Sequence, residues 1–125
     1  MSDGSTDAAA VARAIDETLP LGAMRWAAAH FPEGAIVGGR DGSRVALGSL
    51  AVPVSAIVGA NGAGDAFAAG MLYGLHEQWS IAKCVELGHA SAAASMRAVS
   101  TTEGVATVAE CLALAKRWGF RPLSL

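Results

Sequence analysis

A glycine-rich turn that ends in a carboxylate is the part of this sequence best suited to chemistry. In the stretch VGANGAGDAFAAGMLYGL, Gly59–Gly64 is followed directly by Asp65. The residues after the turn predict a helix, because apolar side chains recur every four positions at Phe67, Met71 and Leu75. Glycines let a backbone approach an anion closely, and a helix N-terminus offers N–H groups and a partial positive charge. The turn is therefore a candidate phosphate-binding site.

Two common phosphate-binding motifs do not fit this turn. A P-loop reads G-x-x-x-x-G-K-[ST], but Asp65 and Ala66 stand where lysine and serine or threonine are needed. A dinucleotide-binding turn, G-x-G-x-x-G, would place Phe67 at its third glycine. Because a carboxylate repels an anion, Asp65 is suited to take a proton from a hydroxyl that attacks a phosphoryl group. Aspartate is also a favoured helix N-cap, and the residues alone leave the two interpretations equally open.

The turn resembles the second signature of the PfkB (ribokinase-like) carbohydrate kinase family. The match consists of GAGDAF at 62–67 followed by AG at 69–70, in a strand–turn–helix setting. In that family the turn forms an anion hole for the transferred phosphate, and its aspartate is the catalytic base. The resemblance therefore implies that Asp65 is the base. It also implies an anion hole made of Gly62, Ala63 and Gly64.

The resemblance extends to residues on both sides of the turn, from about Gly34 to Trp118. Gly39 and Gly42 fall where the family has a G-x-x-G loop between two strands that contacts the nucleotide. His89 falls where ribokinase-like members place a histidine against the adenine-ribose side of ATP. The implied nucleotide-binding set, with the loop Ser100–Gly104 beside it, is Gly39, Gly42, Asn61 and His89.

Two departures from the family pattern limit what the resemblance implies. The family has Asp-Thr just before its turn. This chain has Gly59 and Ala60 at those positions, or Ala60 and Asn61, depending on how the turn is counted. That aspartate helps to hold a monovalent cation, so the resemblance does not extend to potassium activation. PfkB kinases are also more than twice as long, and their N-terminal part carries the sugar-binding glycines, the lid strands and a magnesium-associated N-x-x-E motif. The chain thus resembles the C-terminal, nucleotide-side portion of such a kinase.

Composition indicates one small soluble domain. The chain has 125 residues, 53% of them hydrophobic, and a formal net charge of −2 at pH 7, which gives no electrostatic basis for nucleic-acid binding. No apolar run reaches the ~18 residues of a membrane span, and the N-terminus lacks the basic region of a secretory signal. Cys84 and Cys111 are expected to be reduced thiols of a cytoplasmic protein.

Helical and strand patterns alternate along the chain, which predicts an α/β layered fold with helices on a small sheet. Residues 1–33 are expected to form an N-terminal segment of one or two helices, and residues 34–125 the nucleotide and anion-hole region. A G-x-x-x-G pattern at Gly70 and Gly74 predicts close approach of another element. The expected elements are a helix or remnant at Ala8–Leu19, a helix at Gly22–Phe31, strands at Ala35–Gly38, Arg44–Leu50 and Val54–Val58, and helices at Asp65–Glu77, Ile81–Val99 and Thr107–Trp118.

The resemblance implies an ATP-dependent phosphotransferase that acts on a hydroxyl of a sugar or nucleoside, with Mg²⁺ bound mainly through ATP phosphates. The competing interpretation is a non-catalytic fragment or pseudo-kinase that binds nucleotide or a partner chain, because the acceptor half is missing. That half would cover a sheet edge and apolar surface, so we expect a homo-oligomer or a partner-bound chain. The expected contacts are Arg44–Leu50 and Ala8–Leu19.

Overall fold

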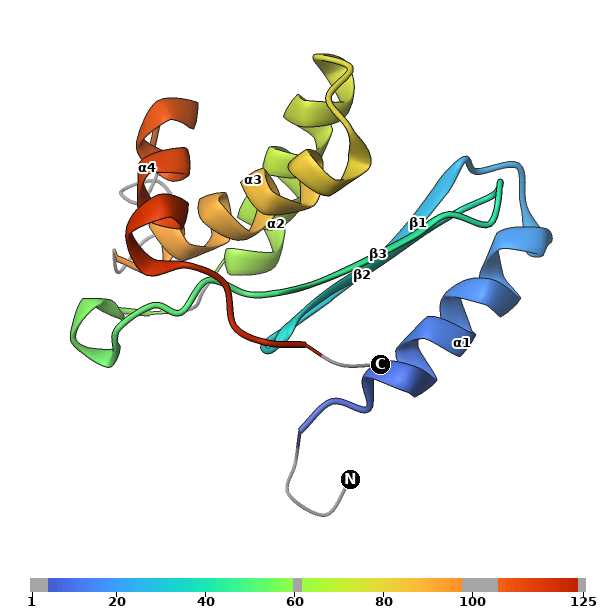
Figure 1. The fold of residues 1–125 in the computed structure, drawn as a ribbon, viewed down its shortest axis with the longest axis horizontal. Coiled ribbons are helices and arrows are strands. Elements are labelled where there is room, and N and C mark those ends of the chain that lie inside the picture. Colours follow the sequence, from blue (N-terminus) through green and yellow to red (C-terminus); the bar gives the residue numbers. More distant parts are fainter. Residues whose placement is uncertain (1–4, 60–61, 98–105, 124–125) are drawn as a thin grey trace. The chain divides into compact units, whose positions relative to one another are not determined.

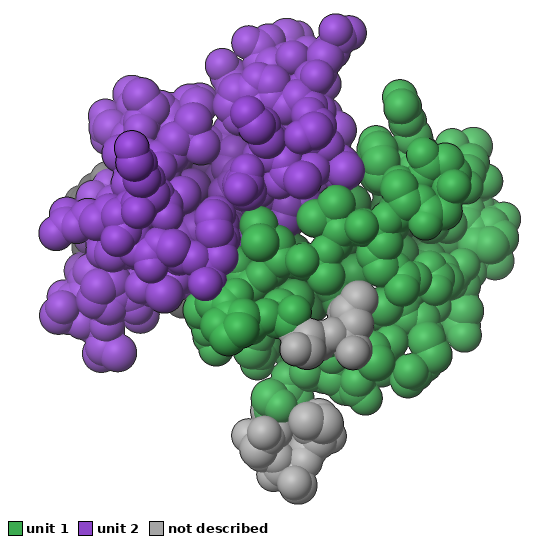
Figure 2. All heavy atoms as spheres, viewed as in Figure 1, with its two compact units in different colours: residues 1–48, 121–125 green, residues 49–120 purple. Residues whose placement is uncertain are grey.

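The computed structural model describes residues 5–59, 62–97 and 106–123, and it confirms the α/β class (Figure 1). The elements form two compact units, residues 1–48 with 121–125 and residues 49–120, which Figure 2 shows in different colours. Each unit has its own hydrophobic core. In chain order the elements are α1 (Ala8–Thr18), the 3-10 helix η1 (Leu19–Leu21), β1 (Trp26–Phe31), β2 (Gly34–Gly39), β3 (Arg44–Gly48), the 3-10 helix η2 (Val54–Ala56), α2 (Ala63–His76), α3 (Ile81–Ser95) and α4 (Val108–Trp118).

The three strands of the first unit form an antiparallel meander in the order β1-β2-β3. Two short turns set its register, so that Phe31 faces Gly34 across the first and Gly38 faces Arg44 across the second. β2 is the central strand and is buried along its whole length. The expected buried strand at Ala35–Gly38 and the strand that pairs back on it are therefore confirmed.

Helix α1 covers one face of this sheet with a single apolar stripe. The stripe packs against Ile36 of β2 and consists of Ala8, Ala12, Ile15 and Leu19. The helix begins after Asp7, whose side chain accepts a hydrogen bond of 3.1 Å from the N–H of Ala10. Because the apolar face of α1 is used within the unit, a contact with another chain would have to use its exposed polar side. The oligomeric state stays a prediction.

The expected helix at Gly22–Phe31 is wrong, because residues 26–31 form strand β1. The alanines of this segment favour a helix, but local propensity is a weak constraint that strand pairing overrides. Each residue of β1 here has a partner in β2. The strand ends where Pro32 and Glu33 make the turn into β2.

In the second unit, α2 and α3 approach each other closely through glycines. A Cβ added to Gly70 would lie 2.8 Å from the carbonyl oxygen of Leu87 and 2.9 Å from the Cα of Gly88. A Cβ added to Gly74 would lie 2.7 Å from the Sγ of Cys84. The close approach predicted from the G-x-x-x-G pattern is therefore confirmed, and a side chain at either position would push the helices apart.

Capping residues set the ends of α3 and α4. The side chains of Ser80 and Thr107 accept hydrogen bonds from backbone N–H groups of the first turns of these helices. Gly119 ends α4 with a φ of 72°. The helix expected at 81–99 ends earlier, at Ser95, where the serine hydroxyl donates a 2.7 Å hydrogen bond to the carbonyl of Ala92.

The strand expected at Val54–Val58 is also wrong. Residues 54–56 form η2, and the side chains of Val54, Ile57 and Val58 are 87%, 43% and 55% exposed. Within the described part of this unit no neighbouring strand pairs with the segment, and an extended strand needs a partner for its backbone groups. An apolar sequence thus stands on the surface directly before the glycine turn.

No helix in the described ranges has the length and apolar character needed to cross a membrane. Cys84 and Cys111 are both free and buried. Burial raises the pKa of each thiol, which favours the protonated, unreactive form.

Candidate functional site

The glycine turn leads directly into the N-terminus of α2. Gly62 is the N-cap, with a φ of 83° and a ψ of 3°, a left-handed conformation that favours glycine. Its carbonyl accepts the first helical hydrogen bond, 2.9 Å from the N–H of Ala66. Among the described residues no side chain caps this helix, whose first N–H groups, at Ala63, Gly64 and Asp65, are the ones that need an acceptor outside the helix. This geometry suits an anion.

Asp65 is exposed in the first turn of α2, three residues after the N-cap. The interpretation of Asp65 as the N-cap is therefore wrong, since Gly62 occupies that position and no side chain makes a capping bond there. Asp65 therefore lies in the same first turn of α2 as these N–H groups. Such a pair of groups can hold a phosphoryl group and take a proton from an attacking hydroxyl.

Helix α3 positions the chain that enters the turn. The N–H groups of Val58 and Gly59 donate hydrogen bonds of 2.7 and 3.1 Å to the carbonyl of Met96, just after the end of α3. The same helix packs against α2 through Gly70 and Gly88. Because α3 contacts the segments before and after the turn, it fixes the direction in which the N-terminus of α2 points.

The second group of predicted residues lies at the tip of the β2–β3 hairpin, in the first unit. Gly42 has a φ of 91°, and its N–H donates a 3.0 Å hydrogen bond to the carbonyl of Gly39. The Asp41 side chain accepts hydrogen bonds from the N–H and hydroxyl of Ser43, at 2.9 and 2.6 Å. The loop expected between two strands at Gly39 and Gly42 is the turn of this hairpin, and whether it contacts a nucleotide stays a prediction.

Arg40, at the same tip, is used by the protein itself. Its guanidinium donates to the carbonyls of Leu19, Gly22 and Met24, which ties the hairpin to the segment after α1. The cavity beside it, of about 300 Å³, is lined by Arg25, Trp26, Arg40 and Asp41. Arg25 lies over the Trp26 ring at 5.9 Å from its centroid, so it makes a cation–π contact within the lining of this cavity.

His89 lies in the interior of the second unit. Its side chain is 1% exposed, and its ring lies 5.1 Å from that of Phe67 and 6.3 Å from that of Phe120. A nucleotide contact at His89 stays a prediction, and in this conformation the imidazole has almost no surface to offer. Asn61 and the loop Ser100–Gly104 lie outside the described residues.

Substitution by alanine is expected to have different effects on the free energy of unfolding at two glycines of the turn. Gly62→Ala places a Cβ at a φ of 83° and is expected to lower the free energy of unfolding by about 1 kcal/mol. Gly64 lies inside the helix and is exposed, so Gly64→Ala is expected to leave stability unchanged or raise it by up to about 1 kcal/mol. Thermal denaturation of both variants measures the difference, and equal losses would contradict these assignments.

The hairpin tip is expected to weaken in acid. Hydrogen bonds from the Ser43 hydroxyl, and then from its N–H, hold the pKa of Asp41 below its usual value. This stabilisation is complete above the ordinary pKa of about 3.9, and it is lost as the pH falls through the lowered value of the folded state. Asp41→Asn keeps an oxygen acceptor and should flatten this part of the stability curve, whereas Glu17→Gln, on an exposed site of α1, should not. Parallel curves for all three proteins from pH 7 to about pH 2 would contradict the expectation.

Comparison with known proteins places this fold in a family. Residues 6–108 match the model of the pfkB family of carbohydrate kinases. A 5-dehydro-2-deoxygluconokinase from Geobacillus kaustophilus (strain HTA426) is 36% identical over 77 residues, which cover 58% of this chain and 23% of that protein. The chain belongs to the pfkB family of carbohydrate kinases.

Solved structures agree on the fold. The nucleoside kinase of Methanocaldococcus jannaschii, an archaeal member of the ribokinase family, superposes with a TM-score of 0.72 at 18% identity, covering 82% of this chain and 33% of that one. The Burkholderia thailandensis nucleoside kinase in complex with inosine gives a TM-score of 0.61 at 24% identity, covering 74% and 30%. The partial ribokinase-like fold is thus confirmed, and the chain spans about a quarter to a third of the length of these relatives.

Proposed function

We propose that this chain contributes the phosphoryl-transfer site of an ATP-dependent kinase of the pfkB type, which acts on a hydroxyl of a sugar or nucleoside. The observation that carries the proposal is the start of α2, where no side chain of the described residues caps the helix and Asp65 is exposed in the same turn as the N–H groups of Ala63 and Gly64. Family membership supports the reaction class.

In the proposed mechanism the turn provides electrostatic stabilisation and a base. The backbone N–H groups of Ala63, Gly64 and Asp65 bind the oxygens of the transferring phosphoryl group, where negative charge is spread in the transition state. Asp65 accepts the proton of the acceptor hydroxyl as that oxygen attacks. Gly62 supplies the left-handed bend that turns these N–H groups outward.

ATP and Mg²⁺ are part of the proposal. Among the described residues no three side chains of His, Cys, Asp or Glu gather as a metal site. In the proposed reaction Mg²⁺ arrives on the ATP phosphates and keeps several waters, because Mg²⁺ is usually held by one or two carboxylates and phosphate oxygens. Gly39 and Gly42 are proposed to contact the nucleotide, together with Asn61 and His89.

The experiment is a phosphoryl-transfer assay over a panel of sugars and nucleosides, combined with calorimetric titration of ATP and Mg²⁺. Transfer to any acceptor, slowed by ~10²-fold or more in Asp65→Asn, would support the kinase. The panel should include 5-dehydro-2-deoxygluconate and inosine, the compounds named for two relatives. Absence of both nucleotide binding and transfer would overturn the proposal for this chain.

A second candidate is a nucleotide- or partner-binding protein without catalysis. It is favoured by the exposed apolar segment before the turn, where Val54 and Val58 are 87% and 55% exposed. Saturable ATP binding with no transfer to any acceptor on the panel would select this candidate over the kinase.

A further inference from the structure

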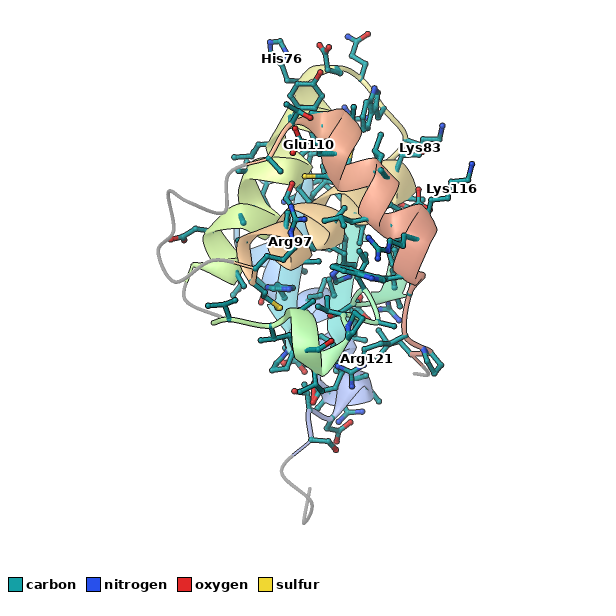
Figure 3. The ribbon with its side chains drawn as sticks, turned by 90° about the vertical axis from the view of Figure 1, so that its left-hand side faces the viewer. His76, Lys83, Arg97, Glu110, Lys116 and Arg121 are labelled. Atoms are coloured by element: carbon teal, nitrogen blue, oxygen red, sulfur yellow. The ribbon has the colours of Figure 1, made fainter. Side chains whose placement is uncertain are left out.

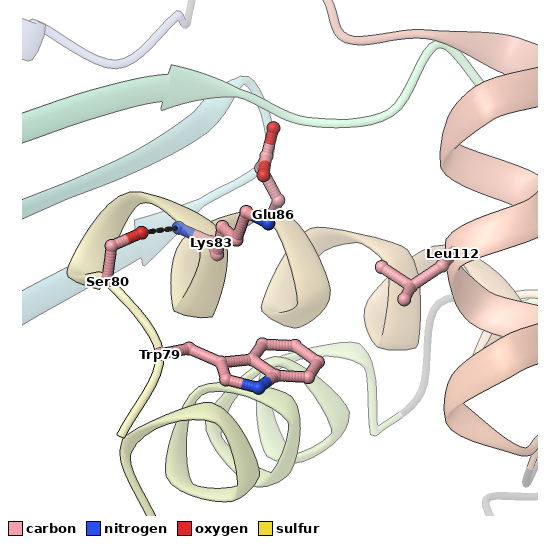
Figure 4. A pocket seen from close by; sticks show the side chains of 5 residues that line it. All are labelled: Trp79, Ser80, Lys83, Glu86 and Leu112. Atoms are coloured by element: carbon pink, nitrogen blue, oxygen red, sulfur yellow. Dashed lines mark hydrogen bonds between the residues drawn. The ribbon is translucent and has the colours of Figure 1, made fainter. Parts of the chain in front are cut away.

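A second cavity lies in the second unit, at the far end of α2 from the glycine turn. Its volume is about 590 Å³, within the range of small-molecule sites. Trp79 follows the C-terminal end of α2, and His76 at that end lies about 17 Å along the helix from Asp65. Figure 4 shows the Trp79 ring and the Leu112 side chain pointing into this space from opposite sides. The lining residues are Trp79, Ser80, Lys83, Glu86 and Leu112.

The aromatic wall of this cavity is held firmly. The N–H of Trp79 donates a 2.9 Å hydrogen bond to the carbonyl of Gly74, and its ring makes an edge contact with Tyr73 at 5.7 Å. Gln78, the residue before it, has a φ of 60°, and it is the one non-glycine residue with positive φ in the described ranges. A positive φ raises the conformational energy of a residue that carries a side chain. At Gln78 this conformation sets the direction in which the chain continues to Trp79.

Two opposite charges line the same cavity. Lys83 and Glu86 lie three residues apart on α3 and therefore on neighbouring turns of one helical face. In the part of the chain that the structure describes, neither side chain takes part in an ion pair. The backbone N–H of Lys83 donates to the Ser80 hydroxyl at 3.4 Å, which leaves the hydroxyl proton available to a ligand.

We propose that this cavity binds a small zwitterion with an apolar or aromatic body, of the chemical class of an aromatic amino acid. The body would lie between the Trp79 ring and Leu112. A carboxylate of the ligand would pair with the Lys83 ammonium, and an amine would pair with the Glu86 carboxylate. Both charges of the cavity are then matched, and the indole contributes apolar contact area.

Charge balance selects this class over other flat ligands. A neutral nucleoside has no charged group that could pair with the Lys83 ammonium. A nucleotide would bring two or more negative charges close to Glu86, which repels them. A ligand with one charge of each sign matches the cavity, since Lys83 and Glu86 together carry no net charge.

Isothermal titration calorimetry with three probes tests the proposal. L-Phenylalanine carries both charges, 3-phenylpropionate lacks the amine, and 2-phenylethylamine lacks the carboxylate. We expect L-phenylalanine to bind with one site per chain. Each of the other two should bind about tenfold or more weakly, because each loses one charge-assisted contact.

Variants assign the contacts. Lys83→Met should weaken the binding of L-phenylalanine about tenfold and leave the affinity for 2-phenylethylamine unchanged. Glu86→Gln should also weaken the binding of L-phenylalanine about tenfold, and it should leave the affinity for 3-phenylpropionate unchanged. Lys116→Met and Glu110→Gln on α4 are matched controls outside the lining, and neither should change binding. Figure 3 shows Lys83 and Lys116 extending from the ribbon on the same side, so both are surface substitutions.

Three outcomes would overturn the proposal. These are no saturable binding of L-phenylalanine up to about 10 mM, equal affinity for all three probes, and unchanged affinity in both Lys83→Met and Glu86→Gln. Trp79→Leu adds an independent check, because loss of the indole should weaken all three probes together. None of these readouts depends on phosphoryl transfer, so the result is separate from that of the proposed kinase.

Discussion

Asp65→Asn is expected to lower the rate of phosphoryl transfer by ~10²-fold or more while leaving nucleotide affinity unchanged or slightly tighter. Asparagine cannot accept the proton of the acceptor hydroxyl, but it keeps the size of the side chain. The N–H groups at the start of α2 remain in place, because Gly62 and not Asp65 is the N-cap. Removal of a negative charge beside the anion hole also removes repulsion of the phosphates.

Steady-state kinetics with the best acceptor, together with calorimetric titration of nucleotide, measures both parts of this prediction. Asp16→Asn is the matched control, since Asp16 is exposed on α1 and its contact is an ion pair with Arg44. A surface ion pair contributes little, so this variant should fold and react normally. Near-normal turnover in Asp65→Asn would show that the carboxylate is only a favourable charge in the first turn of α2.

In the second half of the chain the observed helices match those predicted from the sequence, because local signals and packing agree there. The helices expected to start at Ile81 and Thr107 are present as α3 and α4, and they are capped by Ser80 and Thr107. The G-x-x-x-G pattern at Gly70 and Gly74 predicted the close contact between α2 and α3. Where capping and apolar spacing point to the same element, a single sequence suffices to locate it.

The failures are segments whose structure depends on a partner strand. Trp26–Phe31 has an alanine-rich, helix-like pattern, yet it forms a strand because β2 offers a full set of backbone partners. Val54–Val58 has the apolar pattern of a strand, yet residues 54–56 form a short 3-10 helix, and the described residues around them offer no partner strand. Neither outcome is encoded in local propensity, because strand pairing is a long-range interaction.

The candidate site and the Trp79 cavity also differ in whether local sequence or long-range packing determines their structure. The helix that follows the glycine turn was predictable, because a glycine turn followed by apolar residues every four positions is a local signal. Anion binding by this turn stays a prediction. The Trp79 cavity was not predictable, because it depends on the conformation of Gln78 and on the packing of α4 against α3. The bonds of Arg40 to carbonyls after α1 were not predictable either, because they join residues that are distant in sequence.

Gly70→Val is expected to be the most destabilising of the substitutions considered for the second unit. The added side chain meets the backbone of α3, since a Cβ alone would lie 2.8 Å from the carbonyl oxygen of Leu87 and 2.9 Å from the Cα of Gly88. Backbone atoms cannot move aside without separation of the two helices. We expect a loss of about 3 kcal/mol in the free energy of unfolding, at the upper end for overpacking of a core.

Ala69→Val is the matched control, because Ala69 is the preceding residue of the same helix and is exposed. It should lose only about 0.6 kcal/mol, from the lower helix propensity of valine. Thermal denaturation followed by circular dichroism measures both, and Gly70→Val should lower the midpoint by roughly 10 °C or more. Separation of α2 from α3 would also displace the turn that carries Asp65, so partly folded Gly70→Val should bind nucleotide more weakly than Ala69→Val. Equal stability of the two variants would mean that α2 and α3 do not pack through Gly70 in solution.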